Sequence, residues 1–371
     1  MGKNKKHSLE EDIFGALRKV KGDTKHGNIV DLGMISSVQV DNKGHAIILI
    51  EVDPERGAQM EELRQQVESV AAKVNGVNKV TAILTAEKSV DSGSHGARKR
   101  VNSDPHGMNK NPPVDVPVKH IIVVASGKGG VGKSTLSANL AVSLANKYGK
   151  KVGLLDADIY GPSQPLMMGD EAYKPQLNDD KKLIPANKHG IKIMSIGFIA
   201  DSKKALVWRG PMVQSAFYQM LRDVDWANAD DPLDYLVIDL PPGTGDVQLT
   251  LAQKVRVSGA VIVSTPQDIA LIDARRAVEM FEKTGVPVLG LVENMSNYTC
   301  SNCGHEDHIF GHGGAEDEAK DLGIKFLGGI PLSKDVRVQS DEGIPIAISD
   351  KDSVAAHKIN DISSRIIDAL G

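Results

Sequence analysis

Beyond residue 118, short runs of apolar residues alternate with segments in which apolar residues recur every three or four positions. The first pattern is typical of buried strands and the second of amphipathic helices. Their alternation predicts an α/β domain, a mostly parallel sheet covered by helices on both faces. The expected strands are residues 120–125, 151–155, 191–195, 234–239, 259–264 and 287–293.

The first 87 residues follow another pattern, which predicts a small α+β domain. Ile13, Leu17 and Val20 have helical spacing, and a longer helical pattern runs from Met60 to Val74. The expected strands here are residues 37–40, 46–52 and 79–84, the first two joined by a turn at 41–44.

Residues 88–118 contain almost no large apolar side chain and are rich in Ser, Gly, Asn, Pro and charge. Such a segment cannot bury enough surface to fold, which predicts a flexible linker. The expected domains are therefore 1–87 and 119–371. The basic cluster Arg98-Lys99-Arg100 is interpreted as a solvated part of the linker.

Composition narrows the function classes. The chain has 371 residues and a net charge of −4, which gives no strong general attraction to nucleic acid or anionic membranes. No stretch approaches the roughly 18 apolar residues of a membrane span, and the N-terminus lacks the apolar core of a signal peptide. We expect a cytoplasmic protein without a membrane partner, and the charge does not favour nucleic acid.

A glycine-rich loop with two lysines follows the strand expected at 120–125. Glycines allow successive backbone N–H groups to wrap around a phosphate, and the next helix adds its positive dipole end. Lys133 would reach the β- and γ-phosphates of ATP, and Ser134 would hold Mg²⁺. The nucleotide-binding residues expected in this loop are Gly127, Gly129, Gly130, Val131, Gly132, Lys133, Ser134 and Thr135.

The generic phosphate loop does not require the other lysine, Lys128. It marks a deviant loop that is found in ATPases working as nucleotide-sandwich dimers. We therefore expect a homodimer in which Lys128 reaches the partner's phosphates and, with Lys133, acts in catalysis.

Acidic residues end two of the expected strands. Asp156 and Asp158 follow one strand, and we assign Asp158 the orientation of attacking water and Asp156 a supporting role. Asp239 ends another strand in a Walker-B pattern and is expected to bind Mg²⁺. The Gly- and Pro-containing segment 241–246 beyond it would be a switch, with motion concentrated at its glycines.

Asn294 lies at the tip of the strand expected at 287–293. Its amide offers both a donor and an acceptor, which can recognise an adenine edge, although Asn at a strand end often only forms a turn. The segment containing Pro331 could close over the base from the other side.

Cys300 and Cys303 are the only cysteines of the chain. They are too few for a disulfide framework, and their spacing suggests a pair of metal ligands or a redox couple. A zinc site with two of His305, His308 and His312 is an alternative, although these histidines follow closer than in zinc fingers.

Five segments in register, GKGGVGKST, DADIYGPS, DLPPGTGD, NMSNYTCSNCGHEDHIFGHGG and GGIPLSKDVR, resemble the Mrp/ApbC family of iron–sulfur cluster carrier ATPases over about residues 118–350. The resemblance implies a P-loop domain of the SIMIBI class, a homodimer, and a bridging [4Fe–4S] cluster on Cys300 and Cys303 that is passed to apo-proteins. The first domain resembles the MIP18-type domain of iron–sulfur assembly factors. It lacks the cysteine that many members carry, so we expect a docking or regulatory module.

The number of cysteines agrees with a dimer, because a cubane cluster normally takes four thiolates and one chain offers two. Two other function classes stay open. One is an ATPase switch that positions cell-division or DNA-partition machinery, and the other is a regulatory ATPase. Positioning ATPases can attach to membranes by a terminal amphipathic helix, but the apolar pattern at 357–370 has a mixed-charge polar face and is more typical of a helix that closes the sheet.

Overall fold

The computed structural model describes residues 2–22, 27–41, 44–52, 60–86, 114–199, 210–243, 248 and 255–371. The chain forms two compact units, which we call the small and the large unit. The small unit contains residues 1–114, 176–183 and 200–223, and the large unit contains 115–175, 184–199 and 224–371. Most of the expected linker, including Arg98-Lys99-Arg100, lies outside the described residues.

The small unit contains a three-stranded sheet in the order β1-β2-β3. Strands β1 and β2 are antiparallel, and β2 and β3 are parallel. Buried residues such as Ile13, Leu17, Ile48 and Val67 form one core between this sheet and helices α1 and α2. The unit also includes α5, which contacts β3, although its residues fall within the domain predicted at 119–371. The elements are α1 (Gly2–Leu17), β1 (Ile35–Val40), β2 (His45–Val52), α2 (Glu61–Ala71), β3 (Lys79–Ala86) and α5 (Gly210–Arg222).

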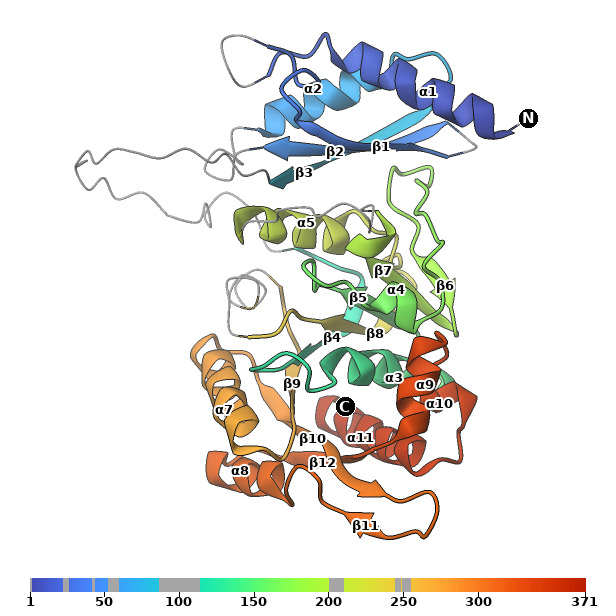
Figure 1. Ribbon diagram of the computed structural model, residues 1–371. Coiled ribbons are helices and arrows are strands. Elements are labelled where there is room, and N and C mark those ends of the chain that lie inside the picture. Colours follow the sequence, from blue (N-terminus) through green and yellow to red (C-terminus); the bar gives the residue numbers. More distant parts are fainter. Residues whose placement is uncertain are drawn as a thin grey trace, which may run out of the picture. The chain divides into compact units, whose positions relative to one another are not determined.

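The large unit is built on a nine-stranded sheet in the order β11-β10-β9-β4-β8-β5-β7-β6, with β12 paired to β10 (Figure 1). Only the β6–β7 and β10–β11 pairs are antiparallel within this described sheet. A mostly parallel α/β sheet is therefore confirmed. The strands are β4 (Val118–Ala125), β5 (Val152–Asp156), β6 (Ala186–Lys188), β7 (Ile191–Ser195), β8 (Leu233–Asp239), β9 (Gly259–Ser264), β10 (Val288–Thr299), β11 (Glu306–Asp307) and β12 (Phe326–Leu332).

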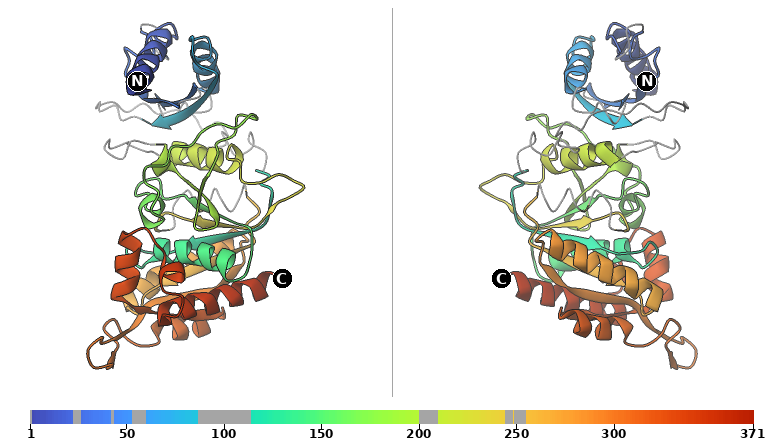
Figure 2. Two further views of the ribbon diagram at one scale, coloured as in Figure 1. Left: turned by 90° about the vertical axis from the view of Figure 1, so that its right-hand side faces the viewer. Right: turned by 90° about the vertical axis from the view of Figure 1, so that its left-hand side faces the viewer.

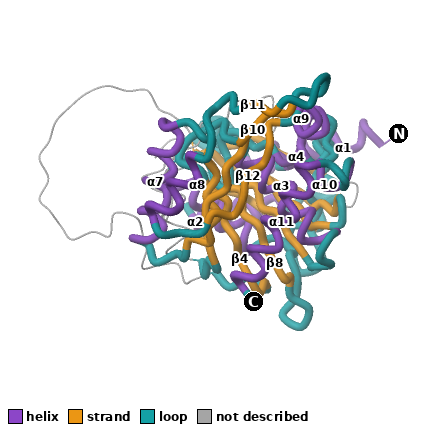
Figure 3. The backbone as a smooth tube through the Cα atoms, turned by 90° about the horizontal axis from the view of Figure 1, so that it is seen from below, coloured by secondary structure: helices purple, strands orange, loops and turns teal. Residues whose placement is uncertain are grey.

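Helices cover both faces of this sheet. Helices α3 and α11 lie on one face, and α7 and α8 lie on the other (Figure 3). The helices of the large unit are α3 (Lys133–Asn146), α4 (Gln164–Met167), α7 (Asp268–Lys283), α8 (Gly314–Leu322), α9 (Lys334–Asp341), α10 (Ile346–Ser349) and α11 (Val354–Leu370).

The C-terminal helix α11 lies beside α3 (Figure 2) and also contacts β12. It buries Ile359, Ile362 and Ile366. The apolar pattern of the tail is thus that of a helix that closes the sheet, as predicted. Among the described residues, no helix has the length and apolarity that crossing a membrane requires.

Candidate nucleotide and cysteine sites

Three neighbouring strands bring the predicted phosphate-binding residues together. The glycine-rich loop follows β4, Asp239 ends β8 and Asp156 ends β5, and these strands are adjacent in the order β4-β8-β5. Asp156 and Asp239 are register partners. The carboxyl ends of parallel strands form one edge of a sheet, which is where ligands bind in open α/β folds.

Lys133 and Asp239 form a buried ion pair at this edge. The Lys133 Nζ lies 2.6 Å from Asp239 Oδ1, and the two side chains are 6% and 0% exposed. The same Nζ lies 3.1 Å from the Ser134 Oγ. The lysine predicted to bind phosphate and the two residues predicted for Mg²⁺ therefore form one cluster.

Two further residues belong to this cluster, Ser137 and Gln164, and neither is predicted from the sequence. The Ser137 hydroxyl donates to Asp239 Oδ1 at 3.0 Å, and the Gln164 amide donates to Asp239 Oδ2 at 2.9 Å. Ser137 stands one helical turn after Lys133, so its position could have been inferred from the helix period. Gln164 follows a turn and carries no comparable signal.

Asp156 is fully buried and accepts four hydrogen bonds, from the backbone N–H groups of Asp158, Ser163 and Gln164 and from the Ser195 hydroxyl. Burial, with a smaller contribution from the nearby Asp239 carboxylate, raises the pKa of Asp156 to about 7. Its hydrogen bonds link the end of β5 to α4. The supporting role of Asp156 at the nucleotide site stays a prediction.

Asp158 is half-buried and lies two residues after the strand. Its Oδ1 accepts a hydrogen bond from the Gly161 N–H at 3.3 Å. Burial raises the pKa of Asp158, and the positive charge of Lys133 opposes that shift. The role of Asp158 in orienting water stays a prediction.

Glycine is required at two positions of the loop, for a different steric reason at each. A Cβ on Gly127 would lie 2.1 Å from the backbone oxygen of Asp273 in α7, so only glycine permits this close approach. Gly132 has φ +87°, and a Cβ there would lie 2.0 Å from Asn294 Nδ2. Lys128 is exposed.

Asn294 contacts the same loop. Its Nδ2 donates to the Val131 carbonyl at 2.9 Å. Asn294 of β10 is the register partner of Ile330 of β12, which places Pro331 at the next position of the neighbouring strand. The two residues predicted to enclose adenine are thus close in the sheet, and Asn294 also holds the loop backbone.

The first residues of the predicted switch leave β8 beside the loop. The Gly243 N–H donates to the Ser126 carbonyl at 2.9 Å, and Gly243 has φ +94°. The Gln248 amide donates to the carbonyls of Pro241 and Gly243, both at 2.9 Å. Residues 244–246 of the predicted switch lie outside the described residues.

The two cysteines lie in a hairpin between β10 and β11. The Cys300 N–H donates to the His305 carbonyl at 2.8 Å, and the Gly304 N–H donates to the Cys300 carbonyl at 2.9 Å. Cys300 is half-buried and Cys303 is exposed. The backbone N–H groups of Cys303 and Asn302 lower the pKa of the Cys300 thiol, which favours the thiolate that binds metal.

The histidines near this hairpin do not complete a metal site. His308 and His312 lie against each other, with their Nδ1 atoms 3.3 Å apart. In the part of the chain that the structure describes, no three His, Cys, Asp or Glu side chains form a group that could hold a metal ion. One chain therefore offers two thiols, and further ligands would have to come from elsewhere.

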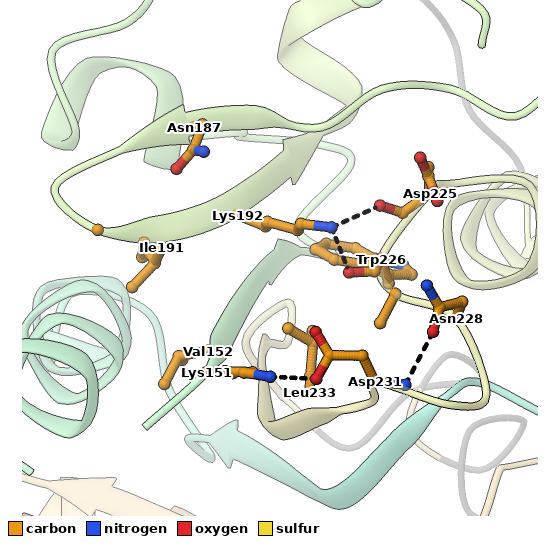
Figure 4. Close-up of a pocket in the computed structure, with 12 residues that line it drawn as sticks. Lys151, Val152, Asn187, Ile191, Lys192, Asp225, Trp226, Asn228, Asp231 and Leu233 are labelled. Carbon is orange, nitrogen blue, oxygen red and sulfur yellow. Dashed lines mark hydrogen bonds and ion pairs between the residues drawn. The ribbon is translucent and has the colours of Figure 1, made fainter. Parts of the chain in front are cut away.

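A pocket of about 360 Å³ lies at the other edge of the sheet, by the amino ends of β5, β7 and β8 (Figure 4). Its lysines already have partners within the fold. The Lys192 Nζ donates to the carbonyls of Asp225 and Trp226 at 3.1 and 2.7 Å, and Lys151 pairs with Asp231. The predicted nucleotide-binding residues lie at the opposite edge, where the strands β4, β8 and β5 end.

Two family models match the chain. One describes the NUBPL iron-transfer P-loop NTPase and matches residues 117–367, and the other describes an iron–sulfur cluster assembly protein and matches residues 10–82. An iron–sulfur cluster carrier protein of Pseudomonas fragi is 53% identical, covering 68% of this chain and 86% of that protein. A mitochondrial iron–sulfur protein required for NADH dehydrogenase in Arabidopsis thaliana is 51% identical, covering 68% and 79%.

Solved structures agree with this likeness. A nucleotide-binding protein of Archaeoglobus fulgidus in complex with ADP is 43% identical, with a TM-score of 0.53 over 61% of this chain and 87% of that protein. The cell-division ATPase MinD of Pyrococcus furiosus, 22% identical with a TM-score of 0.52 over 67% of this chain and 99% of that protein, shares the fold. The chain therefore belongs to the Mrp/ApbC family of iron-transfer P-loop NTPases and carries an amino-terminal domain of the iron–sulfur cluster assembly type.

Proposed function

We propose that this chain is an ATP-dependent iron–sulfur cluster carrier, in which two subunits hold one [4Fe–4S] cluster and pass it to apo-proteins. The single observation that carries the proposal is the exposed hairpin with Cys300 and Cys303. The hairpin offers two thiols, and the described residues supply no third metal ligand beside them. The chain that carries the hairpin belongs to a family of iron-transfer NTPases. A cubane needs four thiolates, which two copies of the hairpin would supply.

The nucleotide part of the proposal is ATP binding at the loop and slow hydrolysis. Lys133 would exchange the Asp239 carboxylate for the β- and γ-phosphates, while Asp158 orients water and exposed Lys128 extends to the partner's nucleotide. The Ser134 hydroxyl and the Asp239 carboxylate form an oxygen donor set that suits Mg²⁺. When bound there, Mg²⁺ would compensate the phosphate charge.

We also propose that hydrolysis changes the segment 241–246 and with it the exposure of the cluster between the subunits. The small unit would serve as a docking or regulatory module. We also propose a cytoplasmic location. This location does not follow from the relatives, because the name of one of them places that protein in mitochondria.

The alternative is a positioning or regulatory ATPase switch, which the shared fold with MinD allows. A membrane-anchored switch needs a terminal helix whose apolar face is available to lipid. Ile359, Ile362 and Ile366 of α11 are buried and the helix contacts α3 and β12, so α11 does not offer such a face.

The test is anaerobic purification of the wild type and of a Cys300→Ala/Cys303→Ala double variant, with iron, sulfide and zinc assays and absorption spectra. We expect about two irons per chain in a wild-type dimer, which corresponds to one bridging cubane. The double variant should lose the cluster and keep nucleotide binding.

Lys133→Ala is the matched control. It should lose nucleotide binding and keep the cluster, and its rate of cluster transfer to an apo-ferredoxin should change on addition of ATP by less than that of the wild type. Zinc without iron and sulfide in the wild type would contradict the carrier proposal. An ATP effect on transfer as large in Lys133→Ala as in the wild type would contradict the coupling.

A further inference from the structure

We propose that Gln164 is a positioning residue of the nucleotide site, which holds Asp239 in place when Lys133 turns from that carboxylate to the phosphates. The inference rests on one part of the proposed function, the binding of a Mg²⁺-nucleotide at the loop, and is independent of the cluster. Gln164 is the first residue of α4 and is fully buried.

The Gln164 amide joins the two elements that carry the site. Its Nε2 lies 2.9 Å from Asp239 Oδ2 at the end of β8 and 3.1 Å from the backbone oxygen of Ser134 in the first turn of α3. An amide nitrogen has two hydrogens, so it can donate to both acceptors. Gln164 therefore fixes Asp239 relative to Ser134, and these are the two residues expected to hold Mg²⁺.

The donors to Asp239 are divided between its two oxygens. Oδ1 accepts from Lys133 and Ser137, whereas Oδ2 accepts from Gln164. Phosphate binding removes Lys133 from this set and leaves a buried carboxylate near the Asp156 carboxyl group. A buried anion without donors is costly, so the remaining hydrogen bonds determine whether Asp239 keeps its orientation.

The other end of the amide carries an acceptor that no described residue satisfies. The Gln164 Oε1 is buried and has no hydrogen-bond partner among the described residues. A buried carbonyl oxygen without a donor is unfavourable and rare in folded proteins. It is suited to accept from a water of hydrated Mg²⁺, because Mg²⁺ usually keeps several of its waters.

The backbone around Gln164 is held independently of its side chain. The Gln164 N–H donates to Asp156 Oδ2 at 3.1 Å. Gly169, just beyond α4, packs closely against Gly343, since a Cβ on Gly343 would lie 2.3 Å from the Gly169 Cα. A substitution of Gln164 should therefore change the hydrogen bonds to Asp239 without moving α4.

The test compares nucleotide affinity with and without Mg²⁺ in the full-length chain. Gln164→Met has a side chain of similar volume that cannot donate a hydrogen bond. Gln164→Asn keeps an amide that is one methylene too short to reach Asp239, and it replaces the methionine variant in the test if that variant does not fold. The probe is fluorescently labelled ADP, titrated in Mg²⁺ and in EDTA. Leu166→Ala is the control, because Leu166 lies in the same helix and is 45% exposed.

We expect Gln164→Met and Gln164→Asn to bind Mg²⁺-ADP about tenfold more weakly, the effect of losing a hydrogen bond to a charged group. Affinity in EDTA should change by less than about twofold, since only the Mg²⁺ form uses Asp239 as a ligand, and Leu166→Ala should match the wild type.

Unchanged Mg²⁺-ADP affinity, or equal losses with and without Mg²⁺, would overturn the inference. A wild type that binds no nucleotide would overturn it together with the ATP part of the proposed function. A wild type that shows the Mg²⁺-specific effect but holds no cluster would contradict only the carrier proposal.

Discussion

The buried ion pair between Lys133 and Asp239 leads to a prediction that separates folding stability from nucleotide binding. Lys133→Met keeps a long side chain in the space and removes the positive charge, which leaves Asp239 as an uncompensated buried anion beside Asp156. We expect lower stability of the nucleotide-free protein and loss of nucleotide binding. A second substitution, Asp239→Asn, removes the stranded charge and should restore much of the stability but none of the binding.

The magnitude follows from the contacts that remain. Removing one partner of a buried ion pair costs about 3 to 5 kcal/mol. Asp239 keeps hydrogen bonds from Ser137 and Gln164, at 3.0 and 2.9 Å, so we expect the lower end, about 3 kcal/mol. For a unit of this size, that lowers the melting temperature by roughly 6 to 12 °C.

The assay is thermal unfolding of the cluster-free, nucleotide-free chain, followed by circular dichroism. Lys128→Met is the matched control, because this lysine belongs to the same loop and is exposed, so the change should stay within about 0.5 kcal/mol. Equal melting temperatures of the Lys133→Met and Lys128→Met proteins would refute the reasoning, as would a double variant no more stable than Lys133→Met.

Three further predictions concern the same edge of the sheet. The folded-state pKa of Asp156 is about 7, which is above its unfolded value, so folding binds a proton between about pH 4 and 7. The free energy of unfolding should therefore fall as pH rises through that window. In denaturant titrations, Asp156→Asn should remove on the order of 2 to 4 kcal/mol of this pH dependence, and an unchanged dependence would contradict the prediction. Gly132→Ala should lower stability by about 1 to 3 kcal/mol more than Gly149→Ala in the same titrations, because both have positive φ but only a Cβ on Gly132 would meet Asn294. Equal losses would show that Asn294 moves aside without cost. Asn294→Ala should reduce the preference for ATP over GTP by about tenfold in competition binding, whereas equal losses for both nucleotides would confine Asn294 to holding Val131.

The fold could largely be predicted because its central strands are continuous apolar runs. The six expected strands correspond to β4, β5, β7, β8, β9 and the first part of β10. Strands β6 and β11 were not predicted because they are short. Strand β12 was not predicted because it contains Gly328, Gly329 and Pro331 and therefore has low strand propensity. The order of the strands depends on packing between distant segments, so an apolar pattern does not reveal it.

The site could be predicted where a motif gives a residue a position at a strand end, as for Lys133 and Asp239. Their ion pair could not, because 106 positions separate them and nothing local indicates that the loop lysine contacts the Walker-B carboxylate. Gln164 was missed for a related reason. Its importance comes from the three chain segments that meet at its amide. The local sequence, a glutamine after a proline-containing turn, does not indicate this contact.

Strand β10 gives a physical reason why the nucleotide and cysteine sites can influence each other. Asn294 holds the loop through Val131, and Cys300 stands six positions later, directly after the end of the same strand. Between them, Met295 has φ +58°, and the pairing with β12 shifts register between Asn294 and Tyr298. A left-handed non-glycine residue costs about 1 to 3 kcal/mol and persists only where its surroundings fix it. A displacement of the loop that moves Asn294 therefore acts on the strained backbone at Met295, which continues along the chain into the cysteine hairpin. Such coupling does not require a series of side-chain contacts across the unit.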